Sequence, residues 1–133
     1  GDAAITRLYK DGIGAAFVTS EAAARTAVGR GVSRADFARG YRPVCQRIAA
    51  DNRFGRLLFR LWDVPRDVPF LLNAWQRAIM AEATQPSAAQ IHTRVLWGMF
   101  TGDESYQSIF LLSISRAALI GFLRGMLRGG RGQ

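Results

Sequence analysis

The fold class is decided first by residues 12–28, which read GIGAAFVTSEAAARTAV. Alanine is the best helix former, so the part from Ala15 to Val28 predicts a helix, and the Gly29-Arg30-Gly31 run ends it. Further along, apolar residues recur at helical spacings, and no run alternates apolar and polar residues over the length of a strand. The sequence therefore predicts a mainly α protein of five or six packed helices, with at most a short strand near the N-terminus.

The next boundaries follow from capping residues and prolines. Ser33 is placed to cap a second helix, with Asp36 at its third position. Pro43 is expected to kink this helix or move its regular part downstream, because proline lacks a backbone N–H. Residues 51–52, Asp and Asn, are expected to separate it from a third helix that ends at the Val-Pro pair of residues 64–65.

Three more helices are predicted in the second half of the chain. The last of them contains a long apolar stretch from Ile109 to Leu127, and a break is expected at residues 84–86. The residues expected to cap these helices are Asp67, Ser87 in capping-box register with Gln90, and Thr101 in the same register with Glu104.

Charge and cysteine content narrow the class of protein. The net charge of +8 comes almost wholly from arginine, which suits phosphate, carboxylate or lipid headgroup partners but also occurs on ordinary surfaces. Cys45 is the only cysteine, so neither an intramolecular disulfide nor a thiolate metal cluster is expected. Residues 1–30 show no signal peptide pattern, and we expect a cytoplasmic protein, peripheral at a membrane if the basic tail described below binds one.

The most informative pattern is the Gly-Asp-Ala-Ala start of residues 1–4, followed by Gly12 and Gly14 at the head of a helix. A carboxylate such as Asp2 offers only acceptors, which suits the hydroxyls of a sugar alcohol. Glycines at a helix start let backbone amides approach a flat ring, and the positive end of the helix favours an electron-rich edge. The pattern is typical of a flavin site.

Residues 1–24 resemble the second FAD motif of the geranylgeranyl reductase-like and p-hydroxybenzoate hydroxylase-like flavoproteins. Residues 41–52 and 99–106 are similar to the C-terminal helices of FAD-dependent oxidoreductases of this group. The resemblance implies that Asp2 contacts the ribityl or phosphate part of FAD, that Gly12, Ile13 and Gly14 lie against the isoalloxazine ring, and that the substrate is apolar. Many relatives have a proline between the two halves of the motif, where this chain has LYKD at residues 8–11.

The glycine pattern that binds the ADP half of a dinucleotide, Gly-x-Gly-x-x-Gly after a strand, does not occur in the sequence. We therefore expect a fragment of a larger α/β flavoprotein fold, whose partner is an N-terminal dinucleotide-binding region. Residues 1–32 are interpreted as the second FAD motif and its helix, and residues 33–133 as a C-terminal helical region, together one compact unit. No residue is assigned as an acid or a base.

A competing interpretation is a helical interaction subunit at a membrane surface or a membrane protein complex. Residues 105–133 contain four arginines and no acid. In this tail one apolar stripe is predicted, and it either lies on an anionic membrane or packs into the core of the domain. The stripe is Leu119, Phe122, Leu123 and Met126, and the arginines on another side are Arg116, Arg124 and Arg128. Nucleic acid is not expected as a partner, because the arginines are spread over many helices.

Several single residues are interpreted structurally. His92 has no second ligand type three or four residues away, so a metal site is not expected. Cys45 is expected to be a small core residue and the carboxylates of residues 103–104 to be charges at a helix start. The three tryptophans are expected to be core or interface anchors: Trp62, Trp75 and Trp97.

Overall fold

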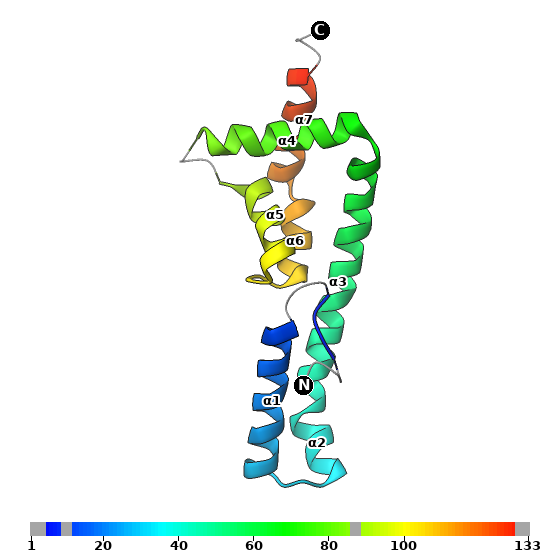
Figure 1. Ribbon diagram of the computed structural model, residues 1–133, viewed down its shortest axis with the longest axis vertical. Coiled ribbons are helices and arrows are strands. Elements are labelled where there is room, and N and C mark those ends of the chain that lie inside the picture. The colour runs from blue at the N-terminus through cyan, green and yellow to red at the C-terminus, as the bar shows by residue number, and fades with distance from the viewer. Residues whose placement is uncertain (1–4, 9–11, 86–88, 130–133) are drawn as a thin grey trace. The chain divides into compact units, whose positions relative to one another are not determined.

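A computed structural model describes residues 5–8, 12–85 and 89–129, with the backbone alone at 128 and 129. This part of the chain is helical throughout its regular structure and contains no strand, so the predicted helical class is confirmed (Figure 1). It divides into two compact units, residues 1–54 and 55–133, where the sequence predicted one unit with a boundary at residue 32. The helices are α1 (Gly12–Gly29), α2 (Arg34–Gly40), α3 (Arg42–Asp67), α4 (Pro69–Ala83), α5 (Ile91–Thr101), α6 (Tyr106–Ser113) and α7 (Arg116–Gly129).

The described residues form seven helices instead of the predicted five or six, because two breaks fall at other places. The chain breaks at Tyr41, so that Pro43 lies in the first turn of α3, where a missing N–H costs little. The last apolar stretch breaks before Ser115, whose hydroxyl accepts a hydrogen bond from the N–H of Ala118 in the first turn of α7 (3.2 Å). In contrast, the break predicted at residues 51–52 is wrong, since α3 continues through them.

The first unit contains α1, α2 and the beginning of α3. The capping box predicted at the start of α2 is confirmed: the Asp36 N–H donates to the Ser33 hydroxyl and the Ser33 N–H donates to the Asp36 carboxylate, both at 3.2 Å. The Ser33 hydrogen bond lowers the pKa of Asp36. The residues of α1 that are buried in this unit are small or polar: Ala15, Thr19 and Thr26.

The boundary between α3 and α4 differs from the prediction. Helix α3 passes Pro65 and ends at Asp67, so the proline sits in its last turn. Asp67 does not cap α4, because its carboxylate accepts hydrogen bonds from the Arg66 side chain (2.9 and 3.4 Å). The N-cap of α4 is Val68, without a side-chain hydrogen bond, and Pro69 follows at the first helical position as expected.

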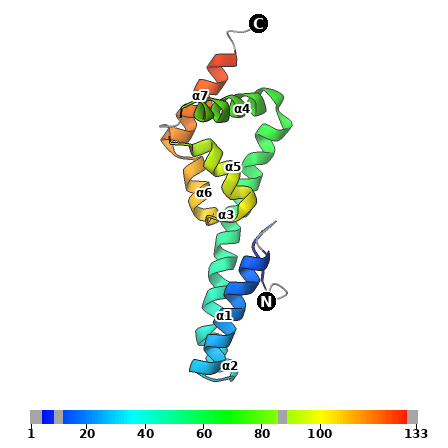
Figure 2. The same cartoon turned by 60° about the vertical axis from the view of Figure 1, so that its left-hand side comes forward.

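In the second unit α4 crosses α7, and both views of the fold show this crossing (Figures 1 and 2). Ala74 and Ala78 of α4 are buried, whereas larger apolar residues of the same helix are only half-buried. These larger residues are Leu71, Leu72, Trp75 and Ile79. On α7, a Cβ added to Gly125 would overlap the carbonyl oxygen of Ala74. Small residues on both helices therefore let the two backbones come into contact.

The start of α5 is capped by a residue from α4. The Glu82 carboxylate accepts hydrogen bonds from the N–H groups of His92 and Thr93, both at 2.9 Å, and from the Thr93 hydroxyl at 3.0 Å. The N-cap residue, Gln90, makes no side-chain cap, and Ser87 lies outside the described residues. A carboxylate from a neighbouring helix thus satisfies N–H groups that the helix itself leaves open.

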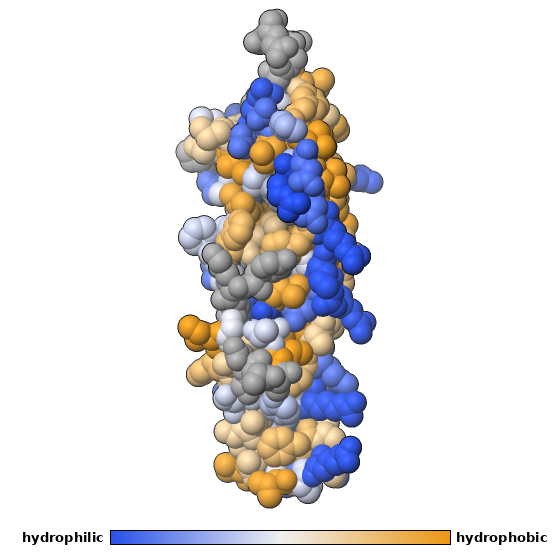
Figure 3. Space-filling view, turned by 45° about the vertical axis from the view of Figure 1, so that its right-hand side comes forward, coloured by the Kyte–Doolittle hydropathy of each residue, from blue (hydrophilic) through white to orange (hydrophobic). Residues whose placement is uncertain are grey.

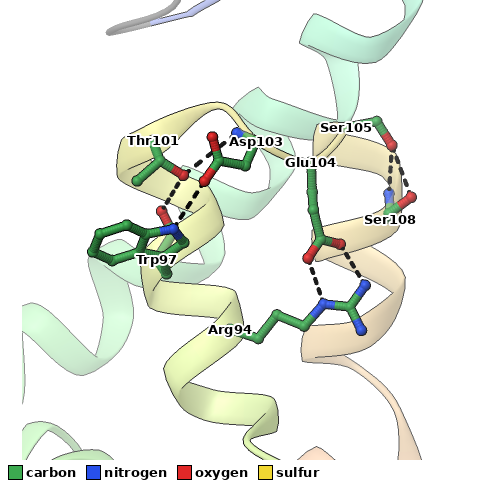
Figure 4. A network of polar contacts seen from close by, with 7 residues as sticks. All are labelled: Arg94, Trp97, Thr101, Asp103, Glu104, Ser105 and Ser108. Atoms are coloured by element: carbon green, nitrogen blue, oxygen red, sulfur yellow. Dashed lines mark hydrogen bonds and ion pairs between the residues drawn. The ribbon is translucent and has the colours of Figure 1, made fainter.

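The turn between α5 and α6 is held by a polar network (Figure 4). The capping role predicted for Thr101 and Glu104 is wrong, because Glu104 is paired with Arg94 and Ser105 caps α6 by accepting the N–H of Ser108 (3.2 Å). The Asp103 carboxylate accepts a hydrogen bond from the indole N–H of Trp97 (2.9 Å). These carboxylates therefore join the two helices at their turn.

The second unit buries Leu58 and Ile109 completely, and the Trp62 and Trp75 rings meet edge to face with centroids 3.9 Å apart. Trp97, expected to be an anchor, is 64% exposed. On the face drawn in Figure 3, hydrophobic side chains reach the surface among hydrophilic ones. Within the described residues no single helix is long and apolar enough to cross a membrane. Helices α6 and α7, which meet at a bend of 53°, have the length and apolar composition of a span only when they are taken together.

The only histidine gives the second unit a predicted pH dependence. Burial lowers the pKa of His92 below its usual 6.5, and the nearby Glu82 carboxylate opposes part of this shift. As the pH falls below about 6.5 the unfolded chain binds a proton before the folded chain does, so we expect stability to be lost as the pH is lowered below about 6.5 and to be unaffected by His92 above that value. Thermal unfolding in a buffer without phosphate measures this, and a His92→Gln variant should flatten the slope. A stability that stays constant or increases as the pH is lowered would contradict this prediction.

Candidate functional site

The site predicted from the sequence centres on the head of α1. Helix α1 begins at Gly12, so Gly12, Ile13 and Gly14 share its first turn as the pattern predicted. Asp2, the fourth predicted residue, lies outside the described residues. The N–H groups of a first helical turn have no acceptor within the helix and carry the positive end of its dipole. The positive end of the helix dipole therefore lies at these three residues.

Just before α1, residues 5–8 are bound to α3 by a buried asparagine. The side-chain amide of Asn52 donates to the carbonyl of Thr6 (2.7 Å), and its oxygen accepts the N–H of Leu8 (3.2 Å). Only 8% of Asn52 is exposed. One side chain thus pairs with two main-chain groups, as a neighbouring strand would, and holds residues 6–8 against α3.

An ion pair supports the same attachment. The Arg7 guanidinium lies 3.4 Å from the carboxylate of Asp51, and both side chains are largely shielded from water, at 13% and 17% exposed. Because the two neighbouring residues of α3 both bind residues 6–8, the segment is held by its main chain and by a side chain. We name Arg7, Asp51 and Asn52 the α3 clamp.

The sequence pattern did not identify the α3 clamp as a site. Asp and Asn favour helix ends and turns, since their side chains bond to nearby backbone, and they were interpreted as a break. In the structure these polar groups bond to a segment more than forty residues away in sequence. The available signal was an Asp-Asn pair inside a continuous apolar pattern, which indicates polar groups that have partners outside their helix.

Four arginines lie close together in the first unit, although the sequence analysis treated the arginines as spread over many helices. A groove of about 660 Å³ runs between α1 and the α2–α3 corner. Four arginines line it, together with Glu21, which pairs with Arg25 at 2.7 Å. The arginines of this groove are Arg25, Arg30, Arg39 and Arg47.

The remaining candidates take structural positions. Cys45 is half-buried rather than a core residue, and its hydrogen bond to Tyr41 raises the pKa of the tyrosine. Among the described residues no group of three His, Cys, Asp or Glu side chains could hold a metal ion. Comparison with known proteins adds no assignment: no family model, curated protein or solved structure matches this chain.

Proposed function

We propose that this chain supplies the flavin-facing edge of an FAD-dependent oxidoreductase, with the helices after residue 32 covering an apolar substrate. The observation that carries the proposal is the head of α1, where two glycines flank Ile13 and the preceding segment is held by the α3 clamp. The sequence resemblance supports the same assignment. A dinucleotide-binding region outside these 133 residues would hold the rest of the cofactor.

The residues at this site suit a flavin in their donor chemistry. Gly12 and Gly14 have no side chain that would keep a flat ring from the backbone of the first turn. The positive helix end favours the electron-rich pyrimidine edge of that ring. Asp2 would accept hydrogen bonds from the ribityl hydroxyls, a role that rests on the resemblance. Bound FAD would supply the hydride chemistry, and this chain would position and tune it.

The outer face of α1 gives further support. Ile13 is 88% exposed, and Phe17, one turn later, is 69% exposed. Large apolar side chains side by side in water are characteristic of surfaces that another body covers. A flavin ring and the missing dinucleotide-binding region would cover this part of α1 in the complete enzyme.

The proposal predicts that FAD is retained through Asp2. The protein is produced from its full open reading frame and purified, and bound flavin is measured by its visible absorbance. We expect a yellow protein, and loss of most of the colour in Asp2→Ala, because the acceptor for the ribityl hydroxyls is removed. Asp67→Ala is the control, since Asp67 forms a surface pair with Arg66 and lies on the other unit. A colourless parent protein, or equal colour in Asp2→Ala, would contradict the proposal.

A second candidate function, a helical subunit at a membrane surface, is favoured by α7. Leu123 is 55% exposed and Leu127 75%, while Arg116 and Arg124 of the same helix are also exposed. Phe122 and Met126, predicted on the same stripe as Leu123, are half-buried, so part of the stripe packs into the unit and part faces outward. Such a protein would be cytoplasmic and peripheral, with α7 on an anionic membrane.

The two functions separate in one pair of measurements. A colourless chain that sediments with phosphatidylserine vesicles, and does so less in Leu123→Ser, supports the membrane subunit. A yellow protein that stays in the supernatant supports the flavin enzyme. Vesicles of phosphatidylcholine alone control for the anionic headgroup.

A further inference from the structure

A second hollow lies on the other unit, beside the crossing of α4 and α7. It encloses about 390 Å³ and is lined by residues of α4, α5 and α7. Its floor contains small residues, among them Ala78, Gly121 and Gly125, because the two helices approach closely there. The absence of long side chains at the crossing leaves room beside it, and we name this hollow the crossing groove.

Two arginines reach the crossing groove from different helices, Arg77 from α4 and Arg124 from α7. Neither side chain forms an ion pair or hydrogen bond with another residue in the described part of the chain. Glu82 is the carboxylate among the described residues that line the groove, and it is hydrogen-bonded to the N–H groups at the start of α5. The two guanidinium groups are not paired with it, so the lining keeps a net positive charge and two groups of the kind that binds oxyanions.

The imidazole of His92 also lines the groove, and it is buried. His92 is 6% exposed, and its Nε2 has no hydrogen-bond partner among the described residues. The Nε2 atom faces Gly121, since a Cβ added there would lie 2.5 Å from it. Buried polar atoms without a partner are rare in folded proteins, and this one belongs to a residue that lines the groove. Because Nε2 is itself covered from solvent, it does not contact a ligand in the groove, but the ring lies next to the groove and reports on what binds there.

We propose that the crossing groove binds a small phosphate-bearing molecule through Arg77 and Arg124, next to the buried ring of His92. A phosphate monoester carries a charge of about −1.5 to −2 near neutral pH, which matches two guanidinium groups better than a single carboxylate does. The volume of the groove lies within the range of small-molecule sites. This site is independent of the flavin proposal, because its residues all belong to the second unit.

The ligand is a soluble phosphate and not the headgroup of a membrane lipid. A headgroup in a flat membrane is best met by arginines on an open surface, whereas Arg77 and Arg124 line a hollow of about 390 Å³ that a small soluble molecule can enter. The two sources share the same phosphate chemistry, so the experiment includes both.

The test follows the single histidine by NMR, because the ring protons of His92 give one set of signals. The purified chain is titrated with inorganic phosphate at constant ionic strength, with chloride as the comparison. We expect a saturable shift with phosphate alone. Arg77→Gln and Arg124→Gln should each weaken the apparent affinity at least about tenfold, since each removes a charge-assisted contact. Arg116→Gln, an exposed arginine of α7 that does not line the groove, should bind as the parent does.

Three outcomes would overturn the assignment. The first is a shift of His92 that follows chloride as closely as phosphate, which would reflect ionic strength alone. The second is an equal loss of affinity in Arg116→Gln and Arg124→Gln, which would indicate general attraction to a basic helix. The third is binding to phosphatidic acid vesicles, dependent on Arg77 and Arg124, without any binding of inorganic phosphate. Circular dichroism of each variant verifies that it is folded.

Discussion

Replacing Gly125 by alanine is expected to lower the free energy of unfolding of the second unit by roughly 3 kcal/mol. The added Cβ would overlap the carbonyl oxygen of Ala74 and lie 3.1 Å from its carbonyl carbon. Both atoms belong to the backbone of α4, so no side-chain rotation relieves the contact and α4 and α7 must move apart. The larger helix propensity of alanine, worth about 1 kcal/mol, acts in the opposite direction and is too small to compensate.

Urea unfolding followed by tryptophan fluorescence measures this effect, because all three tryptophans lie in residues 55–133. The matched control is Gly29→Ala at the end of α1, where an added Cβ meets nothing within 4 Å. That substitution should leave the fluorescence transition unchanged. A Gly125→Ala transition at the parent urea concentration would show that the helices do not meet at this position.

Replacing Asn52 by alanine is expected to destabilise the attachment of residues 5–8 by roughly 2 to 3 kcal/mol. The change removes both hydrogen bonds of the side chain and leaves the Thr6 carbonyl and the Leu8 N–H without the partner that they have in the parent. Alanine is the better helix former, so if the α3 clamp contributed nothing the substitution would stabilise α3. The sign of the effect therefore decides the role of the residue.

Amide hydrogen exchange of Leu8 measures the effect directly, and we expect its protection to be lost in Asn52→Ala. Asn52→Asp should lose almost as much of the Leu8 protection, because a carboxylate can accept a hydrogen bond from the Leu8 N–H but has no N–H to donate to the Thr6 carbonyl. Asn73→Ala is the control, since Asn73 is an exposed asparagine within α4. Protection of Leu8 that survives in both Asn52 variants would contradict the clamp.

The features that were predictable from the sequence are those that depend on near neighbours. The end of α1 at Gly29 and the capping box of Ser33 and Asp36 involve residues within a few positions of each other. The same reasoning failed where a distant residue competes for the same groups. Thr101 and Glu104 have capping-box spacing, yet Glu104 forms an ion pair with Arg94, and the N-cap residue of α6 is Ser105.

The candidate site divides in the same way. The position of the glycines in the first turn of α1 was predictable because the start of a helix depends on residues close to it in sequence. The part played by Asn52 was not, since its partners are 44 and 46 residues away. His92 and the two arginines of the crossing groove come from three helices, and only packing brings them to one hollow.

The contacts of Asn52 have a consequence for sequence divergence. Both go to main-chain atoms, so they place no demand on which side chain stands at position 6. At position 8 they exclude only proline, which has no hydrogen to donate. Homologous chains could therefore diverge through this short segment and keep its path, provided that position 52 remained an asparagine.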